Sequence, residues 1–177
     1  MKYRNTIQSS CDIDFFMLVN GFPIHAASFG MPLPDAVNDI KKNRELILLI
    51  SELEEKTDVL LNEDYIGHRL DLLSVLNGQL GEYDFDEAFS NYKKSFEIMA
   101  SKGFYSYDID IEPYLHEEGY YNLIEKNVSY KLIAKPIHKL NLPQSIIKRL
   151  PMIEIKDFNI ENPLFLIDLN KAWNNKR

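Results

Sequence analysis

The sequence predicts an α+β fold: a single compact domain whose mainly antiparallel sheet starts with an N-terminal β-hairpin and is packed by about three helices. Three observations predict it. An Asn-Gly pair joins two apolar runs near the N-terminus, helical apolar spacing dominates the middle of the chain, and a period of two begins after Phe104. A chain of 177 residues can form a real core. Connectors are short, so we expect one domain over residues 1–177, with 1–11 loosely packed.

The hairpin is centred on Asn20-Gly21, between the runs Phe15 to Val19 and Phe22 to Ala27. A two-residue turn of type I′ needs positive φ at both positions, which Asn and Gly tolerate best. Neither run alternates with polar residues, so we expect both faces of the hairpin to be covered. The hairpin is therefore the expected centre of the sheet.

Three helices are expected from apolar residues at helical spacing. The first is predicted at about 35–55. The second starts after Asn62 as the N-cap and stops near Asn77. The third has Asp84 in a capping box and ends at Gly103, a natural residue just beyond a helix.

Alternation from Tyr105 to Glu112 predicts a half-exposed strand whose polar residues face solvent. The remaining expected elements are a strand at 130–135, a short helix at 143–150, a strand at 153–155 and a last strand, in preference to a helix, at 165–169.

Charge is distributed unevenly along the chain. Residues 1–130 hold 11 Lys/Arg and 23 Asp/Glu, a balance of −12, whereas residues 131–177 have a balance of +5. This argues against nucleic acid as the main ligand, because phosphate binding needs clustered basic residues. The apolar runs are far too short for a membrane span, and the single Cys11 excludes an intrachain disulfide. We therefore expect a cytoplasmic protein.

Candidate catalytic groups are few. Alternate residues of a strand share a face, so Asp108, Asp110 and Glu112 are the candidates to hold a divalent cation in a metal-dependent hydrolase, and a plain solvent-facing row is the simpler interpretation. His25 is interpreted as a structural histidine. No local signature marks Cys11 as a nucleophile. The sequence thus predicts no catalytic residue, no metal site and no cofactor.

Acidic patches are the main positive feature, at 52–64, 82–87 and 108–118. A compact protein with such a surface is suited to bind a basic protein, because opposite fields speed encounter and favour the correct partner. The leading hypothesis is a protein-binding inhibitor of a basic toxin, most plausibly a nuclease; a metal-dependent hydrolase and a non-catalytic scaffold or adaptor are the alternatives. The residues expected to contact the partner are Glu63, Asp64, Asp84, Asp86, Tyr107, Asp108, Asp110 and Glu112.

The chain resembles bacterial toxin-immunity proteins, including those of contact-dependent growth inhibition systems. The resemblance is carried by the FFMLVNGFPIHAASFG opening, the small acidic α+β profile and the composition rich in Asn, Lys and Ile. It implies a tight and specific complex with one cognate toxin and no activity of the protein's own. It transfers no functional residue, and the oligomeric state stays open.

Overall fold

The N-terminal hairpin forms as predicted and occupies the middle of a mixed sheet. The computed structural model describes residues 2–8, 11–77, 85–112 and 128–175. Strands β1 (Asp14–Val19) and β2 (Phe22–Ala27) pair in antiparallel register around a turn in which Asn20 has a φ of 49° and Gly21 a φ of 78°. Both strands are buried apart from their first residues, so the prediction that both faces are covered is confirmed.

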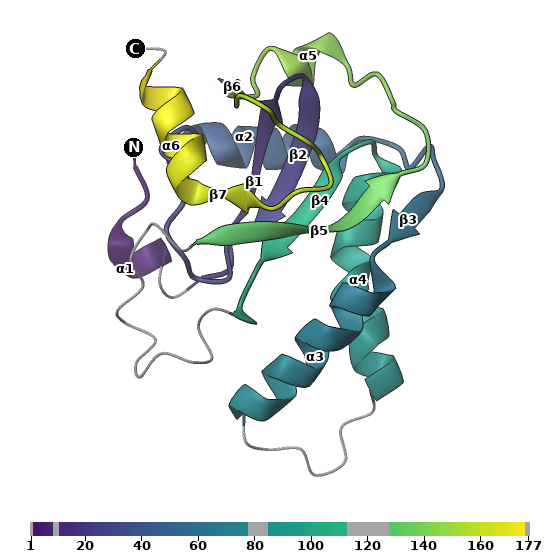
Figure 1. The fold of residues 1–177 in the computed structure, drawn as a ribbon. Coiled ribbons are helices and arrows are strands. Elements are labelled where there is room, and N and C mark those ends of the chain that lie inside the picture. The colour runs from purple at the N-terminus through teal and green to yellow at the C-terminus, as the bar shows by residue number, and fades with distance from the viewer. Residues whose placement is uncertain (1, 9–10, 78–84, 113–127, 176–177) are drawn as a thin grey trace.

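The other strands extend the sheet on both sides of the hairpin in the order β3-β5-β4-β2-β1-β6, while β7 pairs with β5 (Figure 1). The pairs β1–β6 and β2–β4 are parallel and the remaining four pairs are antiparallel, which matches the predicted mainly antiparallel sheet. The added strands are β3 (Val59–Leu61), β4 (Tyr105–Ile109), β5 (Ser129–Pro136), β6 (Met152–Ile153) and β7 (Leu164–Phe165).

The longer helices cover both faces of the sheet (Figure 1). Leu166 and Leu169 of α6 pack on one face, against a cluster that includes Phe15. On the opposite face, α2 packs against Phe16 and α5, while α3 and α4 pack against Ile133. The helices are α1 (Asn5–Gln8), α2 (Ile40–Ser51), α3 (Glu63–Asn77), α4 (Phe85–Ser101), α5 (Gln144–Ile147) and α6 (Leu166–Asn174).

Two of the predicted helix starts differ in outcome. Asn62 caps α3 as predicted, since its side-chain oxygen accepts a hydrogen bond from the Tyr65 N–H at 3.3 Å. The first helix starts later than predicted, because residues 34–37 form a turn and Asp39 is the N-cap, accepting from the Lys42 N–H at 3.1 Å. This helix, α2, also ends earlier than predicted, at Ser51, so Glu54 and Glu55 lie outside it.

The end of α4 is closed as the sequence predicts. The Gly103 N–H donates to the Ala100 carbonyl and the Phe104 N–H to the Met99 carbonyl, which is the Schellman arrangement. The buried Lys102 then extends its ammonium to the Ile50 and Ser51 carbonyls at 3.1 Å, so it caps the C-terminus of α2 as well. Lys102 therefore links the C-terminal end of α4 to the C-terminal end of α2.

Two strand predictions are wrong. Every residue of β4 is buried, because the strand lies between β2 and β5 in the middle of the sheet with both faces covered, so it is not half-exposed. The last strand was predicted at 165–169, but β7 has only two residues and the chain then enters α6. Leu166, Leu169 and Trp173 recur at helical spacing against the core, which favours the helix.

Replacing Gly103 with alanine is expected to cost about 1–3 kcal/mol of unfolding free energy. Gly103 has a φ of +100°, and an added Cβ would lie 2.9 Å from the Leu140 Cβ, so the variant suffers both backbone strain and a clash. Urea unfolding measures the effect. Gly67→Ala in α3 is the matched control, because nothing lies within 4 Å of its Cβ and alanine favours helix. Equal stability of the two variants would contradict this assignment.

Candidate functional site

A buried polar cluster joins α3, α4 and β4 around an ion pair. The Arg69 Nε lies 2.7 Å from the Asp108 Oδ2, and both side chains are at most 3% exposed. The Arg69 Nη1 donates to the Ile109 carbonyl at 2.5 Å, and the Tyr92 hydroxyl donates to the same Asp108 oxygen. The guanidinium also lies against the rings of Phe29 and Tyr92, 5.1 and 5.7 Å from their centroids. The cluster therefore fixes α3 and α4 to the sheet.

The protonation of this cluster follows from its burial. Burial raises the pKa of the Asp108 carboxyl, while Arg69 and the Tyr92 hydroxyl work against that rise by favouring the carboxylate. Burial also raises the pKa of Tyr92 and of Tyr65, so both phenols stay protonated and able to donate. Both oxygens of the Asp108 carboxylate thus have partners within the protein: Oδ2 meets the guanidinium and the phenol, and Oδ1 accepts from the Ile109 N–H.

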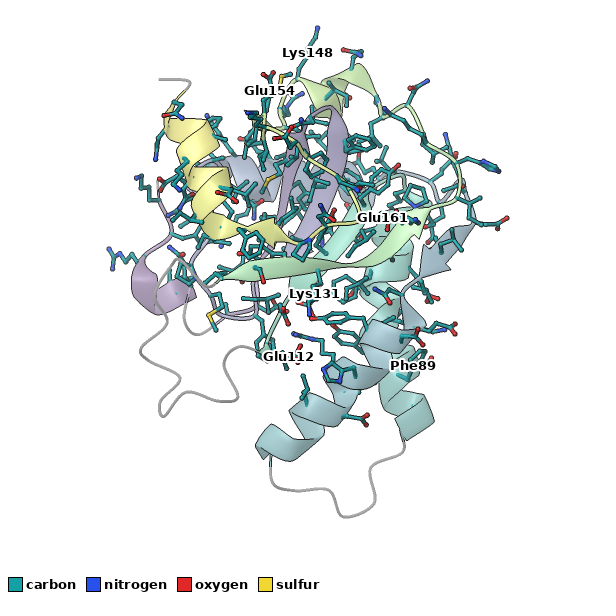
Figure 2. The ribbon with its side chains drawn as sticks, in the orientation of Figure 1. Phe89, Glu112, Lys131, Lys148, Glu154 and Glu161 are labelled. Carbon is teal, nitrogen blue, oxygen red and sulfur yellow. The ribbon has the colours of Figure 1, made fainter. Side chains whose placement is uncertain are left out.

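Asp110 and Glu112 continue the predicted acidic row, and each meets a cation of this chain. The Lys131 Nζ lies 3.0 Å from Asp110 Oδ2 and 3.6 Å from Glu112 Oε2. His68 lies 3.8 Å from Glu112. Figure 2 shows Lys131 and Glu112 close together below β5. Two cations of this chain, Arg69 and Lys131, thus offset part of the charge of the three carboxylates. Within the described ranges no group of His, Cys, Asp and Glu is arranged to hold a metal ion.

Three of the residues predicted to contact a partner are buried. Tyr107 is fully enclosed and its hydroxyl donates to the Ile160 carbonyl at 2.5 Å. Asp108 and Asp110 are only 2% and 7% exposed. Tyr107 and Asp108 lie in β4, a strand with both faces covered, and Asp110 follows that strand beside Lys131. Their burial therefore disfavours these three residues as contacts to a partner.

The other predicted contact residues fall into two groups. Glu63, Asp64 and Glu112 are exposed, the first two in the first turn of α3. Asp84 lies outside the described residues, and Asp86 belongs to α4 but its side chain is not among those described. The acidic patch predicted at 82–87 thus lies mostly outside the described residues, apart from the exposed Glu87.

His25 is a structural histidine, as predicted. Its ring lies between Phe16 and Phe96, with centroids 5.2 and 6.0 Å away, and bridges the two clusters of that face of the sheet. Its nitrogens lie 3.2 Å from Ser106 Oγ and from Asp14 Oδ1. These are the residue types of a hydrolase triad, but Ser106 is 0% exposed, so its hydroxyl cannot meet a substrate.

The pKa of Asp14 reflects the same contact. Burial alone would raise it, but the hydrogen bond and the charge from His25 together outweigh burial and hold the pKa of Asp14 below its ordinary value. The carboxylate is therefore the form that this fold prefers. The contact between Asp14 and His25 ties the first residue of β1 to β2.

A stretch of exposed carboxylates runs from the end of α2 through β3 into α3; we call residues 52–71 the acidic segment. The segment contains two basic residues: Lys56 is exposed, and Arg69 is buried in its ion pair with Asp108. The exposed side chains of the segment are thus mostly acidic, in agreement with the patch predicted at 52–64, and Lys135 of β5 lies across the ladder from Leu60. Its exposed acidic residues are Glu52, Glu54, Glu55, Asp58, Glu63, Asp64 and Asp71.

Two exposed apolar side chains lie next to these acids, at β3 and just beyond β5. Leu60 of β3 is 50% exposed, and Ile137, just beyond β5, is 45% exposed. Leu60 pairs with Lys135, and the Ile137 N–H donates to the Asp58 carbonyl, so the two side chains are diagonal neighbours on one face of the ladder. Beside them a groove of about 520 Å³ is lined by β3, β5, Glu161 and Pro163. An apolar centre with a charged rim is typical of protein interfaces.

Sequence reasoning missed Arg69 and Lys131, the two cations that pair with carboxylates of the acidic row. A signal for Arg69 was present. It lies three residues after Ile66 and next to Leu70, on the buried face of α3, where a charge requires a partner. Lys131 gave no such signal, because its pairing depends on the register Asp108↔Lys131 between two strands far apart in sequence.

The described helices include none that is long and apolar enough to cross a membrane. Comparison with protein families, with curated proteins and with solved structures finds no match to this chain.

Proposed function

We propose that this protein is an immunity protein, a protein-binding inhibitor that neutralises a basic toxin, with a nuclease as the toxin class. The observation that carries the proposal is the acidic segment 52–71, in which seven carboxylates before and after β3 are exposed. Toxins that bind nucleic acid need clustered Lys and Arg, and such clusters complement this segment. A cytoplasmic location, where an incoming toxin would be met, is part of the proposal.

The internal ion pairs support this choice of surface. Asp108 and Asp110 are neutralised by Arg69 and Lys131 and contribute little to the field outside the protein. The acids of segment 52–71 are exposed instead, and within it Lys56 lies 3.3 Å from Glu54. The exposed acids of the segment therefore place negative charge on both sides of β3, which would attract a basic partner.

The test uses two double variants with the same change in net charge. Asp58→Lys/Glu63→Lys reverses the acids on either side of β3, and Glu45→Lys/Glu154→Lys reverses two exposed acids outside the segment. Glu154 lies near α5 and β6, at the far end of the molecule from Glu112 (Figure 2). Binding is measured by surface plasmon resonance against the purified C-terminal domain of a large secreted protein encoded beside this gene.

The first variant is expected to weaken binding by about tenfold or more, mainly by slowing association, and the second by less than about twofold. Association should also slow with added salt. In a bacterial host that expresses the toxin domain, the first variant should protect growth less well than the second. Equal effects of the two variants, or the lack of an adjacent toxin gene, would contradict the proposal. Thermal unfolding of each variant confirms that it is folded.

A further inference from the structure

The outer edge of β3 carries backbone groups that point away from the sheet. The Ile137 N–H donates to the Asp58 carbonyl, and the Asn62 N–H donates to the Ile133 carbonyl at 2.8 Å. Hydrogen-bonding residues alternate along an antiparallel strand, so Asp58, Leu60 and Asn62 face β5. The N–H and C=O groups of Val59 and Leu61 therefore point outward, at the end of the strand order.

These outward groups are not used within the part of the chain that the structure describes. None of the hydrogen bonds between described residues involves the backbone of Val59 or Leu61 on that side. Their side chains pack against the cluster formed with α3 and α4, which lies on one face of the sheet, while Leu60 projects to the other face. The edge itself thus offers two donors and two acceptors to another strand.

We infer that the toxin binds by adding an extended basic segment to the outer edge of β3, so that the sheet continues into the partner; this inference rests on the proposed function. Added strands gain affinity from main-chain hydrogen bonds and specificity from alternate side chains. The partner's alternate residues would stand over Leu60 and the groove beside it. The two lysines that line this groove, Lys131 and Lys135, are already paired with Asp110 and Glu161.

Charge selects the basic partner over other occupants of the edge. Asp58 immediately precedes β3, and Glu63 and Asp64 follow it, all exposed. A second copy of this chain would bring its own acids against these, so pairing of β3 with itself is disfavoured. A strand carrying Lys or Arg would instead meet acids at both ends of the three-residue edge.

The test uses a short synthetic peptide of alternating lysine and valine, and the same peptide with its valine amides N-methylated. Hydrogen exchange of the full-length protein, followed by NMR, reports each amide of β3. The unmethylated peptide is expected to slow exchange at Val59 and Leu61 by about tenfold or more, leaving Leu60, whose amide faces β5, nearly unchanged. The methylated peptide should give no such protection, and Asp58→Lys/Glu63→Lys should abolish the effect.

Equal protection by both peptides, or no protection by either, would overturn strand addition. The result is separable from the test of the proposed function. If the toxin domain binds and the charge reversals weaken it, but the outward amides of β3 stay unprotected in that complex, the inhibitor proposal stands and strand addition fails. If the peptide protects Val59 and Leu61 but no toxin domain binds, the edge is a peptide-binding site and the inhibitor proposal fails.

Discussion

Replacing Asp108 with alanine is expected to lower the free energy of unfolding by about 3–5 kcal/mol. The substitution leaves the Arg69 guanidinium, which is 1% exposed, without its carboxylate in the interior. The Tyr92 hydroxyl loses its acceptor at the same time. Urea unfolding at neutral pH, followed by circular dichroism, measures the loss.

Two further variants make this prediction specific. The double variant Arg69→Met/Asp108→Leu removes both charges and should recover much of the stability, because a buried ion pair offsets its desolvation cost poorly compared with apolar side chains. Glu112→Ala is the matched control from the same acidic row; its contacts to Lys131 and His68 are half-exposed, so its loss should stay below about 1 kcal/mol. A loss for Asp108→Ala as small as that of Glu112→Ala would mean that the pair does not hold α3 to the sheet.

Stability is expected to fall steeply above about pH 10, by about 4 kcal/mol near pH 11. Burial raises the pKa of Tyr65, Tyr92 and Tyr107 in the fold, whereas the unfolded chain has ordinary tyrosines. A raised pKa in the folded state means that the contribution is fully present below the unfolded pKa and is lost as pH rises through the folded one. Each such tyrosine costs about 1.4 kcal/mol per pH unit above 10.

The measurement is a series of urea unfolding curves from neutral pH to about pH 11. Tyr107→Phe is the informative variant. It loses the hydrogen bond to the Ile160 carbonyl, about 1 kcal/mol at neutral pH, but its stability should then fall less steeply with pH because one phenol is absent. A pH slope equal to that of the wild type would contradict the assignment of Tyr107 as a protonated, enclosed phenol.

Local chemistry was sufficient to predict several elements. The turn at Asn20-Gly21, the Asn62 cap and the Gly103 closure of α4 are set by the φ preferences and hydrogen-bonding capacity of single residues, and all three are confirmed. The helical stripe of α4 was also visible, because Phe96 and its apolar neighbours recur at helical spacing.

The errors arose where a pattern was interpreted without its neighbours. The alternation of Tyr107 and Asp108 predicts one core face and one solvent face, but β4 lies between β2 and β5 and is buried on both faces. A polar residue in such a strand faces another element rather than water, and here Asp108 faces Arg69. The strand predicted at 165–169 is wrong because a short apolar run fits both the strand period and the helix period. Packing of Leu166 and Leu169 against the core favours the helix α6.

By itself, the sequence determined the α+β class, the central hairpin, three of the helices and the excess of negative charge in residues 1–130. Those features depend on composition and on contacts between residues close in the chain. Only the tertiary structure decided which acids are buried in ion pairs and which, such as Asp58 and Glu63, face solvent beside an open strand edge. That distinction depends on strand order and register, which join residues far apart in the chain and leave no local signal.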